Sequence, residues 1–277
     1  MAVMIGRTNL ASVPDSYFAP IAETPMTGRY LAGPSTAGPW APQLQHGGPP
    51  NALAVAVAER AVREQTGRTD LVALRISSDF VGPVPVAEID ARARIVRAAR
   101  SAALVEVVIS AGDRDCLLAR IWFVRDADTR AIAHPVEPPT AVPDVARGLD
   151  WHFGYGSSLE WRFIRGRMAE PGPAAAWVRP TRTLVEGYEL SGLARTALIA
   201  DSASGISAEL NWSEWSFLNV DLDVHLSRPL EGEWVLLDAV TSLGAHGSAL
   251  ARSTLSDSCG VVGAGLQTLV LAPIPTP

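Results

Sequence analysis

Residues 51–62, NALAVAVAERAV, predict a helix that is apolar on nearly every side. A surface helix keeps one polar face, so a helix of this kind is a buried helix. The preceding HGGPP at 46–50 suits its start, because prolines are tolerated in the first turn and glycines let the chain turn sharply inward. We expect one central helix, running to about residue 65, wrapped by a curved antiparallel sheet.

Strand-like stretches follow this helix and then recur later in the chain. The first series lies at 71–80, 87–99, 101–110 and 116–125. After a proline-dense segment, the second series comprises strands near 159–166 and 175–179, a helix at about 192–210, and strands at 219–227, 233–243, 247–256 and 262–271. The Gly- and Pro-rich region 1–45 predicts an irregular lead-in with one short strand near Tyr30.

The repeated order of elements indicates an internal duplication. Residues 51–123 overlay residues 197–269 without a gap, at an offset of 146, which places Pro83 on Pro229. Few letters are identical, so the prediction depends on the order and spacing of the elements. It divides the chain into an N-terminal unit at 1–125, a proline-rich linker at 126–149 and a C-terminal unit at 150–277.

The overlay also tests for function, because a purely structural position should carry a similar residue in both units. At three positions the first unit is apolar and the second is polar. The pairs are Val55 and Asp201, Ala73 and Asn219, and Ile121 and Gln267. A carboxylate in an apolar helix is costly unless it is paired, hydrogen-bonded or protonated, and Asn and Gln carry the donors that it needs.

Asp201, Asn219 and Gln267 are therefore the candidate catalytic residues. On one helix and two strands of the same sheet, they could hold a single water molecule, with Asp201 as its general base and the amides orienting it. The alternative is a buried polar cluster that only fixes the packing. Three coincident asymmetries favour the catalytic interpretation.

His46, Gly47 and Gly48 are the candidate substrate-binding residues. Glycines at a helix N-terminus leave backbone N–H groups that can polarise a carbonyl or bind an anion. The alternative is a glycine turn beside a surface histidine with no role in binding. The other histidines show no metal-ligand spacing with cysteine or with each other, so we expect no metal site.

Composition excludes several classes of function. The net charge of −6 gives no support to nucleic-acid or anionic-membrane binding, and all 23 basic residues are arginine, which excludes lysine Schiff-base chemistry. No apolar run is long enough to span a bilayer, the N-terminus lacks the apolar core of a signal peptide, and the 2 cysteines make no disulfide framework. We expect a cytoplasmic protein.

Five stretches together resemble the acyl-CoA thioesterase II-like family in its actinobacterial form. They are LQHGGPPNALAVAVAERA (44–61), AAAWVRP (174–180), ALIADSASGISAEL (197–210), SFLNVDLDVHLSRPLEGEWVLLDA (216–239) and GVVGAGLQTLVL (260–271). The resemblance implies an α+β double hotdog, in which two tandem units each wrap a curved antiparallel sheet around one long helix. It also implies a homodimer, a role in lipid metabolism, and hydrolysis of acyl-CoA to free acid and CoA without a cofactor.

The family's active site resembles an Asp on the second helix, a Ser, Thr or Asn on the following strand, and a Gln on the last strand. Asp201, Asn219 and Gln267 match these positions. The resemblance implies that Asp201 deprotonates water while backbone N–H groups at a helix start hold the thioester carbonyl. Arginines would bind the CoA nucleotide. SASG after Asp201 departs from the family, where an aromatic often follows, and Asn219 is not a hydroxyl residue.

Three other functions remain as alternatives. A non-catalytic acyl-CoA-binding module would keep an apolar tunnel without a competent base. A hotdog dehydratase or hydratase would use a His–Asp or His–Glu pair, but no histidine occupies the equivalent of Asn219 or Gln267. A serine esterase would need a G-x-S-x-G elbow, which the sequence lacks, although HGG is similar to an esterase oxyanion loop.

Overall fold

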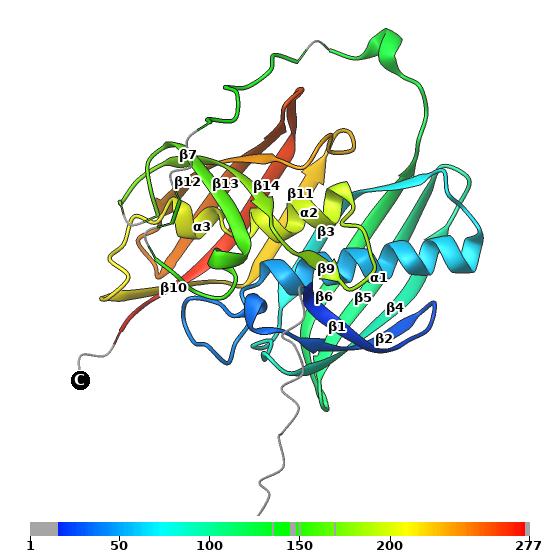
Figure 1. The fold of residues 1–277 in the computed structure, drawn as a ribbon, viewed down its shortest axis with the longest axis horizontal. Coiled ribbons are helices and arrows are strands. Elements are labelled where there is room, and N and C mark those ends of the chain that lie inside the picture. Colours follow the sequence, from blue (N-terminus) through cyan, green and yellow to red (C-terminus); the bar gives the residue numbers. More distant parts are fainter. Residues whose placement is uncertain (1–15, 135, 145–147, 150, 169, 275–277) are drawn as a thin grey trace, which may run out of the picture.

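The computed structural model describes residues 16–134, 136–144, 148–149, 151–168 and 170–274. It has the expected α+β double hotdog architecture, with one continuous 14-stranded, mainly antiparallel sheet whose two curved halves each wrap around helix (Figure 1). The first half contains β1 (Ser16–Glu23), β2 (Thr27–Ala32), η1 (Pro34–Thr36), α1 (Gly48–Thr66), β3 (Leu71–Phe80), β4 (Glu88–Ala98), β5 (Ala102–Ala111) and β6 (Arg114–Arg125).

The connection and the second half follow in similar order. The elements are η2 (Arg130–Ile132), η3 (Gly156–Ser158), β7 (Leu159–Arg165), β8 (Ala174–Pro180), β9 (Thr183–Val185), α2 (Gly192–Ala200), α3 (Ala203–Ile206), β10 (Trp215–Asn219), β11 (Asp221–Leu226), β12 (Val235–Leu243), β13 (Ser248–Asp257) and β14 (Gly260–Pro273). The ends at residues 1 and 277, and the predicted boundary at 150, lie outside the described residues.

The two halves join edge to edge through β3 and β11. Their strands run in equivalent order on either side of this junction, β1-β2-β4-β5-β6-β3 and β7-β8-β12-β13-β14-β11. Ser77 lies opposite Asp223, and these two positions are 146 residues apart, the same offset as in the duplication. Equivalent residues of two repeats face each other in this way when a two-fold axis relates the repeats. The register shifts after Ile109 in one half and after Leu255 in the other, again 146 apart.

Helix α1 is buried for most of its length, as its apolar sequence predicts. Its residues from Ala52 to Val55 are all 0% exposed, and it packs against β4, β5 and β6. Gly67 ends the helix in the left-handed conformation, with φ of 64°, that favours glycine at this position. Helices α1 and α2 also pack against each other where the two halves meet.

The second helix is shorter than the predicted 192–210. It ends at Ala200, and Asp201 caps it before the four-residue α3. A continuous helix would give the Leu198 carbonyl to the N–H of Ser202. The Tyr155 hydroxyl donates to that carbonyl instead, at 2.6 Å, and Ser202 N–H turns to Ile199 O at 3.0 Å. A side chain from outside the helix thus accompanies the break.

Three other sequence expectations need correction. The lead-in contains two strands, β1 and β2, and β2 alternates exposed and buried residues over TGRYLA, a period-2 signal that its glycine masks. The stretch 219–227 belongs to two strands, β10 and β11, which separate at Val220. The short strand β9 escaped prediction because it is set by tertiary pairing, in parallel, with β1.

The segment between the halves lies against the second sheet. Trp177 Nε1 donates to Thr140 O at 2.9 Å, and an Arg162 nitrogen lies 2.5 Å from Pro143 O. These bonds fasten the proline-rich stretch to β7 and β8, so it is more than a spacer. In the described part of the chain, no helix combines the length and apolar character needed to cross a membrane.

Candidate active site

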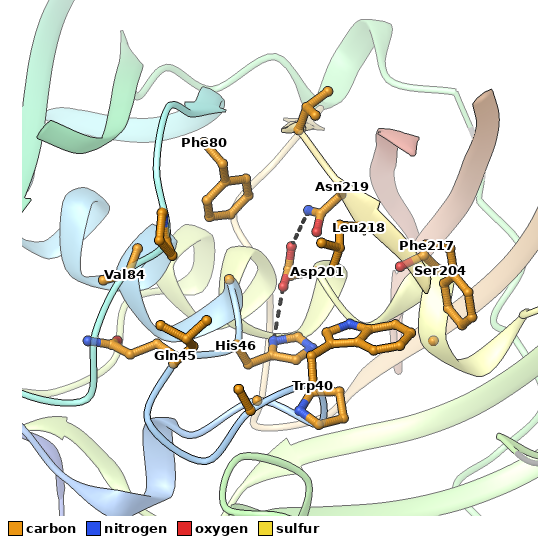
Figure 2. Close-up of a pocket in the computed structure, with 18 of the residues that line it drawn as sticks. Trp40, Gln45, His46, Phe80, Val84, Asp201, Ser204, Phe217, Leu218 and Asn219 are labelled. Atoms are coloured by element: carbon orange, nitrogen blue, oxygen red, sulfur yellow. Dashed lines mark hydrogen bonds and ion pairs between the residues drawn. The ribbon is translucent and has the colours of Figure 1, made fainter. Parts of the chain in front are cut away.

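A pocket of about 460 Å³ opens where the two halves meet (Figure 2). From the first half, the loop that leads into α1 and the loop after β3 line the pocket. From the second half, the α2–α3 break and β10 line it. The α1 loop reaches across to the other half, since Tyr155 N–H donates to Ala37 O at 2.9 Å. The pocket is therefore composite.

The structure brings the three candidate catalytic side chains together. Asp201 Oδ1 accepts from Asn219 Nδ2 at 2.8 Å and from Gln267 Nε2 at 3.1 Å. Asp201 is only 4% exposed. Asn219 ends β10, which pairs with β14, and β14 carries Gln267, so the sheet itself sets the two amides beside the helix break.

The side-chain amides of Gln267 and Asn219 differ in the hydrogen bonds that they make. Gln267 Nε2 donates to both Asp201 Oδ1 and Asp201 O, and Oε1 accepts from Ser204 N–H at 3.1 Å. Gln267 is 1% exposed and stands behind the pocket wall. Asn219 does line the pocket, but its second N–H is given to Asp221 O. With both amide donors occupied, Asn219 offers a bound water only its carbonyl oxygen.

His46 contacts the same carboxylate, which the sequence did not indicate. Its Nδ1 lies 2.9 Å from Asp201 Oδ2 and 3.2 Å from Gly48 N. One ring nitrogen cannot both donate to the carboxylate and accept from the amide, and an ionised carboxylate only accepts. We therefore assign the Nδ1–H tautomer from the network, although the Gly48 N–H points at this nitrogen and Gly48 does not line the pocket. The overlay held a signal, since position 192, 146 residues after His46, is glycine.

The His46 ring is held in place by stacking. It lies parallel to Tyr155, with 3.9 Å between ring centroids and 8° between planes. Tyr155 is fixed in turn by its hydrogen bonds to Leu198 O and Ser202 Oγ. Burial raises the pKa of the Tyr155 phenol well above its usual value, so this ring keeps its hydroxyl proton as a donor.

Gly47 and Gly48 are needed for close approach. A Cβ on Gly47 would lie 2.7 Å from Asp201 Oδ2, and one on Gly48 would overlap the Leu198 carbonyl oxygen. Gly47 has an ordinary helical φ of −68°, so the expectation that these glycines provide a special turn conformation is replaced by a steric reason. The Gly47 N–H has no hydrogen-bond partner among the described residues.

The rest of the pocket lining is mainly apolar. Trp40, Trp212 and Phe217 form one wall, with the Trp40 and Trp212 rings 5.0 Å apart and the Trp212 and Phe217 rings 4.4 Å apart. Phe80 and the loop that follows it form the opposite side (Figure 2). No arginine is among the described lining residues, so this pocket does not supply the cationic contacts expected for a CoA nucleotide.

Two family profiles match the chain in tandem. The acyl-CoA thioesterase N-terminal domain matches residues 36–124, and the acyl-CoA thioesterase C-terminal domain matches residues 135–271. The chain belongs to the acyl-CoA thioesterase family. Among curated proteins, none matches the sequence of this chain.

Solved structures share its fold at low sequence identity. A Novosphingobium aromaticivorans protein proposed to be a thioesterase is 22% identical, with a TM-score of 0.72 over 91% of this chain and 97% of its own. The acyl-CoA thioesterase II of Mycobacterium marinum is 14% identical, with a TM-score of 0.69 over 93% and 97%. The TesB protein of Mycobacterium avium subspecies paratuberculosis is 16% identical, with a TM-score of 0.68 over 92% and 96%.

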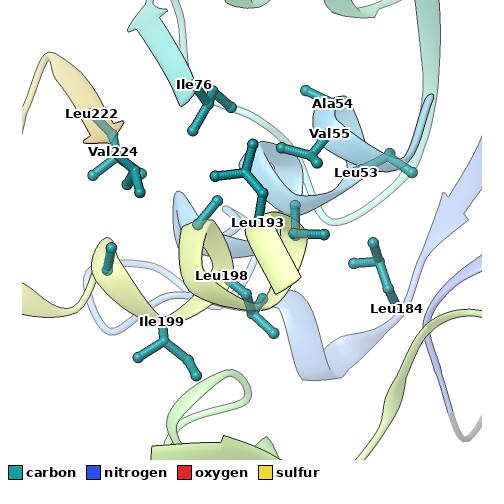
Figure 3. Packing of buried hydrophobic residues seen from close by; sticks show 14 of the residues in the cluster. Leu53, Ala54, Val55, Ile76, Leu184, Leu193, Leu198, Ile199, Leu222 and Val224 are labelled. Atoms are coloured by element: carbon teal, nitrogen blue, oxygen red, sulfur yellow. The ribbon is translucent and has the colours of Figure 1, made fainter. Parts of the chain in front are cut away.

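The pseudo-equivalent location in the other half is filled. Val55 stands where Asp201 does, and Leu193 stands where Gly47 does. Both are fully or almost fully buried in the main apolar cluster, together with Ile76, Leu198 and Leu222 (Figure 3). The polar residues and the space for a ligand thus occur together at one of the two related positions.

Proposed function

We propose that this protein is an acyl-CoA thioesterase that hydrolyses its substrate by general-base activation of water. The observation that carries the proposal is the Asp201 carboxylate. It is buried at the base of an apolar pocket, is fixed by hydrogen bonds, and faces the N-terminus of α1. A thioester has the parts that match these features, an apolar acyl chain and a carbonyl that gains negative charge during attack.

The hydrogen bonds of Asp201 identify the basic atom. Oδ1 already accepts from two amides, whereas Oδ2 faces only His46 Nδ1. Each carboxylate oxygen accepts about two hydrogen bonds, so Oδ2 keeps one position for water. The second hydrogen of that water can bond to Asn219 Oδ1, which leaves a lone pair free to attack. Gln267 and His46 hold the carboxylate in position and do not touch the water.

Gly47 supplies the proposed oxyanion contact. It lines the pocket, and its N–H has no partner among the described residues, whereas the Gly48 N–H points at His46 Nδ1. In the reaction, water oxygen bonds to the carbonyl carbon and its proton passes to Asp201. The C–S bond then breaks, CoA leaves as the thiolate, and the proton returns to the thiolate or to solvent. Donors aimed at the developing oxyanion lower the barrier to the tetrahedral intermediate.

The direct test is release of free thiol from a panel of acyl-CoA esters of different length. The proposal expects catalytic turnover of at least one ester. Retention of acyl-CoA binding with no thiol release from any ester would contradict it and support the non-catalytic binding module.

One observation favours a second candidate, a hydratase or dehydratase acting on acyl-CoA. Such enzymes use a His–Asp or His–Glu pair, and His46 from the first half meets Asp201 from the second. The same assay separates the two candidates. A hydratase would consume 2-enoyl-CoA, seen as loss of the conjugated absorbance, and release no thiol. We favour the thioesterase because both family profiles that match the chain describe acyl-CoA thioesterase domains.

The homodimer, the cytoplasmic location, the role in lipid metabolism and the unit boundaries at 1–125 and 150–277 remain proposals. Unpaired strand edges favour self-association, and the sheet has its outer edges at β7 and β9. Light scattering coupled to size-exclusion chromatography would test the dimer, and a mass of one chain would contradict it.

A further inference from the structure

Ser204 places an unpartnered hydroxyl in this pocket. The residue is 8% exposed and lines the pocket beside Asp201. Gln267 holds its backbone N–H, but its hydroxyl bonds to no residue in the part of the chain that the structure describes. The two neighbouring hydroxyls differ, because Ser202 Oγ pairs with Tyr155 and Ser207 Oγ pairs with Thr241.

The duplication marks the same position. The residue 146 before Ser204 is Ala58, fully buried on α1 at the filled counterpart of the site. Ser204 thus shows the asymmetry of Asp201, Asn219 and Gln267, polar where a pocket exists and apolar where none does. Because Ser202 and Ser207 also overlay alanines, Ala56 and Ala61, the asymmetry singles out Ser204 only together with its unpartnered hydroxyl at the pocket.

Ser204 belongs to the deep part of the pocket wall. It is 8% exposed and Phe217 is 5% exposed, whereas Val81 and Leu218, at 52% and 50%, lie at the rim. The bulky CoA end must reach solvent across the rim, so the acyl chain enters the deep part. The acyl chain therefore passes the free hydroxyl.

The spacing from Asp201 places this contact near the thioester. Asp201 and Ser202 keep right-handed helical dihedrals, so the i,i+3 side chains are separated by roughly 5–6 Å between Cβ atoms. The attacking water and the carbonyl carbon occupy the space next to Asp201. The first carbons beyond the carbonyl then come within reach of Ser204.

Building on the proposed thioesterase activity, we infer that the preferred acyl group carries a hydroxyl or oxo oxygen on its third carbon, hydrogen-bonded to Ser204 Oγ. A serine hydroxyl both donates and accepts, so it can pair with either group. A saturated chain would cover the hydroxyl and leave it without a partner. Sites that hydrogen-bond a substrate hydroxyl discriminate strongly against the analogue that lacks it.

The test is a substrate-by-variant comparison of kcat/KM, with 3-hydroxyhexanoyl-CoA and hexanoyl-CoA as the substrate pair. The wild type should prefer the hydroxylated ester by about tenfold or more, the loss expected when one buried hydrogen bond is left unmade. Ser204→Ala should remove that preference, chiefly through the hydroxylated ester. Ser207→Ala is the matched control, a buried hydroxyl removed outside the pocket, and it should keep the preference.

Each other outcome overturns the inference in a recognisable way. Equal kcat/KM for the two esters in the wild type would show that the pocket does not distinguish a hydroxylated third carbon from an unsubstituted one. An equal fall for both esters in Ser204→Ala would show that the hydroxyl acts on the reacting end that they share. Wild-type release from other esters but not from the hydroxylated one would also refute it, whereas no release from any ester would refute the proposed function itself.

Discussion

At the scale of single residues, the Asp201 carboxylate has different partners on its two oxygens. Asn219 and Gln267 occupy Oδ1, and His46 faces Oδ2. The duplication identified three of these four residues, because polarity at a structural position is visible in the letters. His46 was assigned only to substrate binding, since nothing local in HGG reveals that the histidine reaches the other half of the molecule.

Asp201→Asn should keep the fold and acyl-CoA binding but lose most turnover. The amide preserves the shape and can still accept from Asn219, but it cannot take a proton from water. Loss of a general base costs on the order of 10²–10⁴-fold in kcat. Thiol release, with circular dichroism as the fold check, measures this. Cys259→Ala is the control and should retain full turnover, whereas wild-type turnover in Asp201→Asn would refute the mechanism.

Asn219→Ala and Gln267→Ala should each lower kcat by less than Asp201→Asn does. Each removes support for the carboxylate, and neither removes the base. Because all three residues act as one unit, either change should add little to the loss already present in Asp201→Asn. Kinetics of the single and double variants test this. Losses that multiply independently would show that the amides act elsewhere.

At the scale of elements, α1 and α2 meet at a titratable contact. Burial raises the pKa of Glu59 on α1 to about 7, and a hydrogen bond with Ser191, the N-cap of α2, together with the Arg63 charge, opposes the rise only in part. The folded state therefore binds the Glu59 proton more tightly than the unfolded state does. Its stabilising effect is complete below the ordinary glutamate pKa and is lost as pH rises through the folded-state pKa of about 7.

Relative to Glu59→Gln, which cannot ionise, the wild type should lose about 1–3 kcal/mol of unfolding free energy between pH 4.5 and pH 7. Urea unfolding of both proteins across this range measures the difference. From about one pH unit above the folded-state pKa of about 7 the gap should stay constant, because Glu59 is then ionised in both states. A gap that does not change with pH would mean that Glu59 is solvated in the folded protein.

At the scale of the whole molecule, two related halves provide one ligand site. Val55 and Leu193 fill the counterpart of the pocket, so a variant that binds without hydrolysis should take up one acyl-CoA per chain. Isothermal titration of Asp201→Asn with a substrate measures this ratio. Two equivalents per chain would show that the filled counterpart opens. As a comparison, the Leu193→Ala variant should be less stable, because it loses buried apolar contacts, and it should still bind only one acyl-CoA per chain.

The sequence by itself determined the repeat, the central buried helix, most strands, and Asp201 with the two amides, Asn219 and Gln267, that donate to its Oδ1. These features follow from apolar periodicity and from comparison of two copies, which are local or pairwise properties of the letters. Only the tertiary structure decided that the helix breaks at Asp201, that His46 faces Oδ2, and that Ser204 is left free. Each depends on contacts between segments far apart in the chain, such as Tyr155 with Leu198, where a side chain from outside the helix takes a hydrogen bond that the helix would otherwise use.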